Sequence, residues 1–136
     1  MTRIIAAAFT YAIAAFAAGF ILGVIRVLEV IPRLGETLAV LLETPIMLVV
    51  SWLVSRACVR TFRVGASTTE RALMGAIAFA ILMLAELTLS VAVFHRSPTE
   101  YAHTFLSLAG AVGLAAQIAF ALIPWIQSRI PQRDSN

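Results

Sequence analysis

The chain has 136 residues, of which 61% are hydrophobic and only 12% are charged, and its formal net charge is +3. A soluble domain usually carries about 25% charged residues, so this composition excludes a protein that faces water on all sides. All ten basic residues are arginines, and most of them flank apolar segments. That arrangement suits lipid headgroups and argues against a nucleic-acid partner. The single cysteine, Cys58, excludes an internal disulfide, and we expect it to pack as a small apolar side chain.

Four apolar segments separated by short polar stretches predict four transmembrane helices. We place them at residues 4–31, 36–63, 68–94 and 98–128, followed by a short tail at 129–136. Each segment is long enough to cross a hydrocarbon core of about 30 Å at roughly 1.5 Å per residue. The sequence therefore predicts an all-α integral membrane protein, with residues 1–136 forming a single transmembrane domain built as a four-helix bundle.

The first segment opens like a signal peptide, but its apolar run continues to Ile25, so we expect an uncleaved span. Small residues recur at intervals of four in this segment and in the third and fourth segments. The three stripes are Ala15, Gly19 and Gly23; Ala72, Ala76 and Ala80; and Ala111, Ala115 and Ala119. Helices in lipid associate through close contact between small residues. The stripes therefore predict tight packing, either within one chain or between copies in a homo-oligomer.

Proline, glycine and capping signals mark the expected ends of the helices. Pro32 and Gly35 should end the first helix and form a short turn. The Ser-Thr-Thr-Glu pattern at 67–70 and the Ser-Pro-Thr-Glu pattern at 97–100 are capping boxes that open the third and fourth helices. Pro45 removes a backbone hydrogen bond from the second helix and should kink it.

The arginines predict the orientation of the bundle. Seven of them fall on one side of the predicted spans and three on the other. The seven are Arg3, Arg56, Arg60, Arg63, Arg71, Arg129 and Arg133, and the three are Arg26, Arg33 and Arg96. The positive-inside rule therefore places both termini in the cytoplasm (N-in/C-in). The compact, lysine-free composition rich in alanine and arginine indicates a bacterial inner membrane.

Arg56, Arg60 and Arg63 form one face of the second segment at its predicted cytoplasmic end. Anionic lipid headgroups are the expected partners of this face. Docking of another protein, such as a membrane-protein partner, is the alternative.

Six charged residues fall inside the predicted spans or close to their outer ends: Arg26, Glu29, Arg33, Glu36, Glu43 and Glu86. A charge at the centre of a span costs roughly 2.5–3.5 kcal/mol on insertion scales. Glu43 and Glu86 would lie at similar depths, about 9–12 Å below the outer boundary. We therefore expect Arg26 to bridge Glu43, Glu86 or both, within an outer layer formed by the other three residues.

Two interpretations of this cluster remain open. One arginine cannot fully neutralise two deep carboxylates, so a remaining glutamate would bind a proton or a cationic substrate. The alternative is an ion-pair network that only holds the bundle together. Gln117, deep in the fourth segment, is expected to make an interhelical hydrogen bond.

Motifs for zinc proteases, nucleophile elbows, phosphate loops and dinucleotide binding are absent from the sequence. We therefore expect no enzymatic activity and no cofactor. His95 and His103 lie near the predicted outer surface, but two histidines are too few for a metal site.

Three functions are consistent with these features. The first is a non-enzymatic accessory or interaction protein with a buried Arg/Glu network. The alternative is a small oligomeric proton-coupled transporter or channel that uses Glu43 and Glu86, and a second alternative is an enzyme acting on lipid. A water-accessible cavity reaching Glu43 would favour transport, whereas a dry and fully paired cluster would favour the accessory role. An outer groove with exposed carboxylates would favour the enzyme.

Overall fold

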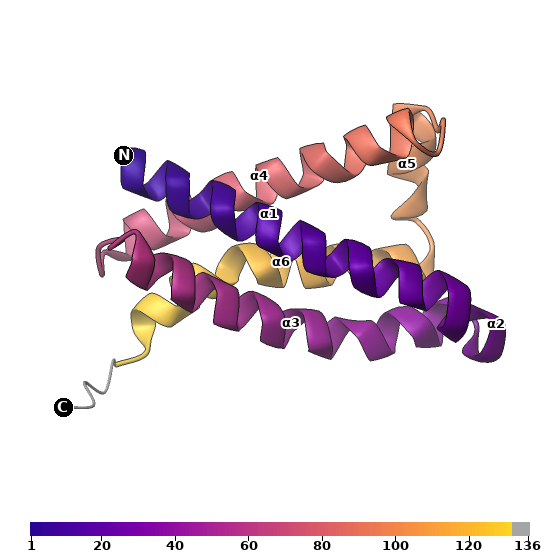
Figure 1. Cartoon of the computed structure of the whole chain (residues 1–136), viewed down its shortest axis with the longest axis horizontal. Coiled ribbons are helices and arrows are strands. Elements are labelled where there is room, and N and C mark those ends of the chain that lie inside the picture. The colour runs from indigo at the N-terminus through magenta and orange to yellow at the C-terminus, as the bar shows by residue number, and fades with distance from the viewer. Residues whose placement is uncertain (132–136) are drawn as a thin grey trace.

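The computed structural model describes residues 1–131, whose regular secondary structure is entirely helical (Figure 1). The predicted tail beyond Pro131, which includes Arg133, lies outside the described residues. Within the described part, four helices are long and apolar enough to cross a membrane: Thr2–Leu34, Glu36–Thr61, Thr68–Ala92 and Leu108–Arg129. Their bounds lie within a few residues of the predicted segments, except where the fourth begins.

The first long helix changes its geometry near its end. It consists of α1 (Thr2–Ile25), a π-helical turn η1 (Arg26–Val30) and α2 (Ile31–Leu34). Pro32 has no N–H, and in a regular α-helix its ring would collide with the carbonyl group of Leu28. The wider π turn directly before Pro32 accommodates this residue. Gly35 then ends the helix with a φ of 81°, which favours glycine, and α3 (Glu36–Thr61) begins at the next residue.

Pro45 lies inside α3, which continues through it as one helix. The bend expected at this proline stays a prediction. The Thr44 hydroxyl donates a hydrogen bond to the carbonyl oxygen of Val40 at 2.8 Å, beside the turn from which Pro45 removes a donor.

The fourth predicted segment is divided, in contrast to the continuous helix expected over 98–128. A short helix α5 (Pro98–Thr104) precedes α6 (Leu108–Arg129). Ser107 caps α6 by accepting a hydrogen bond from the N–H of Gly110 at 3.0 Å. A Cβ atom at Gly110 would collide with the carbonyl oxygen of Thr104, so this glycine allows the two helices to meet closely.

The two predicted capping boxes have different outcomes. The box at Ser97 is confirmed, because the Glu100 N–H donates to the Ser97 hydroxyl at 3.1 Å and the Ser97 N–H donates to the Glu100 carboxylate at 2.7 Å. At Ser67 the expected helix start is present, since Ser67 is the N-cap of α4 (Thr68–Ala92). The predicted capping box is not formed there, because the Ser67 side chain makes no capping hydrogen bond. The buried Arg71 instead holds this loop by donating to the carbonyl oxygen of Gly65 at 2.7 Å.

The long helices form a ring in which each packs against two neighbours, in the order α1, α3, α6 and α4. We call the end of the bundle that contains Thr2, Thr61, Thr68 and Arg129 the closed half, and the opposite end, which contains η1 and α5, the open half. The main hydrophobic cluster lies in the closed half. In Figure 1, α4 diverges from α1 and α3 toward the open half.

The closed half is held by side chains that cross between helices. Tyr11 reaches from α1 to α6, where its ring stacks on Phe120 with 4.2 Å between ring centroids. The buried Ser55 hydroxyl donates to the Gln127 side-chain oxygen at 2.9 Å, and the Gln127 amide donates to the carbonyl oxygen of Trp52. Cys58 is buried within the same half, as a small apolar group would be.

Only part of the small-residue stripes makes the expected contacts: Ala15 is buried in the main hydrophobic cluster, whereas Ala111 and Ala115 are exposed. Gly19 and Gly23 line a cavity, and a Cβ atom at either position would meet only a side-chain atom, at 3.6 Å and 3.8 Å respectively. Ala72, Ala76 and Ala80 are exposed on the outer surface of α4. The close helix contact is instead made by Gly75, where a Cβ atom would collide with the carbonyl oxygen of Ala121.

Candidate functional site

A cavity of about 630 Å³ fills the open half of the bundle and is lined by all four long helices. This volume lies within the range of about 300–1,000 Å³ that is typical of small-molecule sites. Most of the lining is apolar, and it includes five phenylalanines: Phe16, Phe20, Phe94, Phe105 and Phe120. The charged lining residues are Arg26, Glu36, Glu43 and Glu86, so three carboxylates face one guanidinium.

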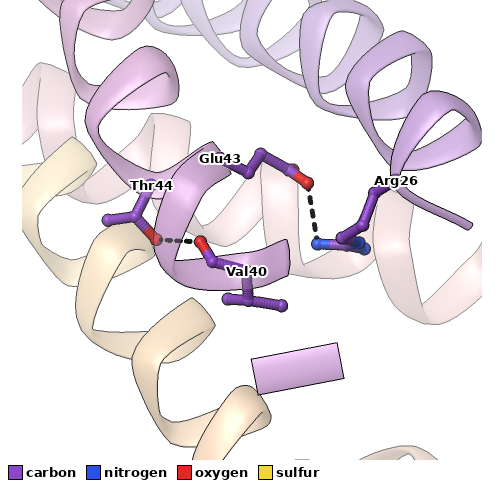
Figure 2. Close-up of polar contacts among 4 residues, drawn as sticks. All are labelled: Arg26, Val40, Glu43 and Thr44. Carbon is purple, nitrogen blue, oxygen red and sulfur yellow. Dashed lines mark hydrogen bonds and ion pairs between the residues drawn. The ribbon is translucent and has the colours of Figure 1, made fainter. Parts of the chain in front are cut away.

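Arg26 and Glu43 form an ion pair across the cavity, with 3.0 Å between the Arg26 Nη1 and the Glu43 Oε2 (Figure 2). Their side chains are 31% and 15% exposed, so the pair is largely shielded from the surroundings. The contact lacks the alignment of a hydrogen bond, and the Glu43 Oε2 is buried without a hydrogen-bond partner among residues 1–131. This oxygen therefore keeps its capacity to accept a hydrogen bond.

Arg26 lies where the regular part of the first helix ends. Arg26 is the first residue of η1, and its carbonyl oxygen accepts the N–H of Ile31, five residues later. A π turn changes the direction in which the following side chains project, and such turns are frequent at functional sites.

Glu86 has neutral partners in place of a cation. The Gln117 side-chain amide donates to both of its carboxylate oxygens, at 2.8 Å and 2.7 Å, and the Tyr101 hydroxyl donates to one of them at 3.2 Å. Arg26 acts on Glu86 only through space, because no cation in the described residues lies within ion-pair distance of this carboxylate. The Gln117 side-chain oxygen is also buried without a hydrogen-bond partner in residues 1–131.

Tyr101 belongs to the short helix α5 and approaches Glu86 from the outer end of the cavity. Burial, together with the neighbouring Glu86 carboxylate, raises the pKa of the Tyr101 phenol above its ordinary value. Tyr101 therefore keeps its proton at neutral pH and acts as a hydrogen-bond donor to Glu86. Its ring makes an edge contact with Phe105, with 5.2 Å between centroids.

The outer layer expected around Arg26 is only partly present. Glu29 and Arg33 pair with each other at 3.2 Å, with side chains 64% and 77% exposed, and neither lines the cavity. An exposed pair of this kind contributes little stability. Glu36 is exposed and lines the cavity. The structure thus brings Arg26, Glu36, Glu43 and Glu86 to one cavity and leaves the other two predicted residues outside it.

The remaining candidate residues lie away from this cavity. Arg56 and Arg60 are exposed on α3 in the closed half, whereas Arg63, predicted on the same helix face, is exposed beyond the end of α3 with a φ of 52°. His95 and His103 are exposed, and no group of three or more metal-binding side chains occurs in residues 1–131.

Two features of the site were not predicted from the sequence. They are the contact between Tyr101 and Glu86 and the presence of five phenylalanines in the cavity lining. The sole signal for Tyr101 was the capping box at 97–100, which starts a helix one turn before it.

No protein-family model, curated protein or solved structure matches this chain. The function therefore has to be argued from the cavity itself.

Proposed function

We propose that the protein is a small transporter that spans a membrane, binds an amphipathic organic ammonium ion in the open-half cavity and exchanges it for a proton at Glu86. The observation that carries this proposal is a cavity lined by phenylalanines in which the Glu86 carboxylate contacts only neutral donors. The orientation with both termini in the cytoplasm of a bacterial inner membrane, and assembly as an oligomer, belong to the same proposal.

The charges of the cavity select a cation. Arg26 is engaged by Glu43, which leaves Glu86 and Glu36 as the carboxylates without a paired cation in the described residues. The buried side-chain oxygen of Gln117, which lacks a hydrogen-bond partner in residues 1–131, adds further negative potential. Such an acceptor-rich site attracts a positive ligand, and intramembrane carboxylates commonly mark proton or substrate pathways.

The apolar lining selects an organic cation. Quaternary ammonium groups bind over aromatic faces through cation–π attraction, and a carboxylate supplies the opposing charge. The five phenylalanines of the lining can surround both the ammonium group and an apolar body attached to it. A small inorganic cation would gain little from such walls, because it would lose its water without equivalent ligands.

Exchange with a proton follows from the chemistry of a single carboxylate. Glu86 can be neutralised by the ammonium ion or by a proton, and the two compete for it. When neither is bound, Gln117 and Tyr101 stabilise the carboxylate by hydrogen bonding. This competition is the basis of coupling between the two ions in our proposal.

The cavity favours transport over the accessory role that the sequence placed first. A dry and fully paired cluster would have supported an accessory protein, whereas here a cavity reaches both Glu43 and Glu86. The docking of a partner on Arg56, Arg60 and Arg63, and the enzymatic alternative, stay predictions without further support.

Calorimetry in lipid nanodiscs tests the binding step. We expect 4-phenylbutyl-trimethylammonium to bind the native chain, and its neutral tert-butyl isostere to bind at least about tenfold more weakly because it lacks the charge. Glu86→Gln should weaken binding of the ammonium ion by about tenfold or more, since it removes the opposing charge.

Glu29→Gln is the matched control, because Glu29 lies outside the cavity in an exposed pair. It should leave the affinity unchanged. Equal affinity of the ammonium ion for the native chain and the Glu86→Gln variant would refute the proposal.

A further inference from the structure

A second apolar groove lies on the outer surface between α1 and α4, next to the main cavity. It is a shallow groove of about 460 Å³, lined by Phe16 of α1, by six residues of α4 from Ile81 to Ala92, and by Val93 just beyond that helix. The one hydroxyl group in its lining, that of Thr88, is engaged by the carbonyl oxygen of Leu84 at 2.7 Å. The groove therefore offers hydrocarbon contacts and no free hydrogen-bonding group from a lining side chain.

Two residues lie at the boundary shared by the groove and the main cavity. Phe16 and Leu89 line both spaces, so each contacts the cavity on one side and the groove on the other. Both residues are partly buried, and a passage between the two spaces would require their side chains to change rotamer. Leu89 lies three residues after Glu86 on α4, so this boundary is one helical turn from the carboxylate.

The groove also faces outward. Leu84 and Val93 are 65% and 57% exposed, so a chain lying in the groove would contact the surrounding lipid on its outer side. A ligand whose charged group is held at Glu86 and whose tail is hydrocarbon would satisfy both spaces at once. The carboxylate would receive the charge, and the groove would receive the chain.

Building on the proposed function, we infer that the ligand is a single-chain, lipid-like ammonium ion whose alkyl tail passes between Phe16 and Leu89 into the groove on α4. The two spaces share Phe16 and Leu89 in their linings and differ in polarity, and both observations support this arrangement. The main cavity provides carboxylates, an amide and aromatic rings, whereas the groove provides aliphatic contacts. A short-chain ammonium ion would occupy the main cavity alone.

Fluorescence quenching by a bromine atom at the end of the chain tests the position of the tail. The probe is ω-brominated dodecyltrimethylammonium, and the reporter is Leu84→Trp in a background where Trp52 and Trp125 are replaced by Phe. Leu122→Trp in the same background is the control, because Leu122 is exposed on α6 and lines neither space. Probe dissolved in lipid quenches both reporters, so the informative signal is the part that an excess of 4-phenylbutyl-trimethylammonium displaces.

We expect displaceable quenching at position 84 and none at position 122. Ala85→Phe should abolish the displaceable part by filling the groove, while the short ammonium ion still binds to the main cavity. If both ammonium ions bind in calorimetry but quenching at position 84 cannot be displaced, the tail does not lie in the groove and the inference is wrong. Absence of binding by either ion would instead overturn the proposed function itself.

Discussion

Among individual residues, Tyr11 compensates for a proline in another helix. Pro124 has no N–H, so the carbonyl oxygen of Phe120, four residues earlier in α6, loses its helical donor. The Tyr11 hydroxyl donates to this oxygen at 2.9 Å, and Tyr11 is fully buried. A tyrosine in the first helix thus satisfies a backbone group that a proline leaves free in the last one.

Tyr11→Phe should lower the free energy of unfolding by about 1–3 kcal/mol, because it leaves a buried carbonyl oxygen without a donor. The loss would be measured by titrating the purified chain from mild detergent into dodecyl sulfate. Tyr101→Phe is a matched control, since the Tyr101 hydroxyl bonds Glu86 near the outer end of the cavity and crosses no packed interface of the closed half. A larger loss of stability from Tyr101→Phe than from Tyr11→Phe would contradict this account.

Arg26 forms an ion pair with only one of the two deep glutamates, Glu43, and not with Glu86. Arg26 lies 3.0 Å from Glu43, which leaves Glu86 to Gln117 and Tyr101. The positions of the two glutamates along their helices were enough to predict that both lie at a similar depth. The choice of partner could not be predicted from these positions, because depth along a helix does not determine where the Arg26 side chain points.

At the scale of helices, close approach is concentrated at Gly75 and is absent at Gly19. A Cβ atom at Gly75 would collide with the backbone of α6, whereas a Cβ atom at Gly19 would meet only the end of the Met47 side chain at 3.6 Å. The spacing of small residues in the sequence predicted contacts for Gly19 and Gly23. Spacing alone could not reveal that this face lines a cavity, because a stripe fits a neighbouring helix and a ligand equally well.

Gly75→Ala should therefore destabilise the protein by about 1–3 kcal/mol through overpacking between α4 and α6. Gly19→Ala should be neutral or stabilise by up to about 1 kcal/mol, because alanine has the higher helix propensity and space is available. The same detergent titration would compare the two variants. Equal destabilisation by both substitutions would show that α1 also packs closely through its small residues.

The division of the fourth segment was also beyond prediction from the sequence. Residues 98–128 carry no Asp or Arg and only Glu100 as an acid, so the apolar pattern continues across the break. Ser107 ends that continuity by capping α6, and Gly110 allows α5 to fold back against it. The break matters for the site, because it lets α5 carry Tyr101 to Glu86.

For the whole molecule, composition and apolar length predicted four long helices, which the structure contains among residues 1–131. Their ends follow from local chemistry, such as Gly35 and the capping box at Ser97. The asymmetry between a closed half and an open half does not follow from local chemistry. It arises from side chains that cross between distant segments, such as Tyr11 with Phe120 and Ser55 with Gln127.

The proposed transport depends on this difference between the open half and the closed half. The cavity lies in the open half of the bundle, while the main hydrophobic cluster lies in the closed half. Transport requires a second conformation in which the closed half separates. Pro124 and Gly75 lie together where α4 meets α6 in that half.

The most direct test of proton exchange at Glu86 uses proteoliposomes that carry a pH-sensitive dye inside. A gradient of 4-phenylbutyl-trimethylammonium is imposed across the vesicle membrane, and the internal pH is followed. The ion carries a permanent charge, so it cannot change the pH by crossing as a neutral base. We predict that protons move against the ammonium ion in vesicles with the native chain and that Glu86→Gln abolishes this movement. Proton movement of equal size with the Glu86→Gln variant, or none with a native chain that binds the ion, would contradict the account.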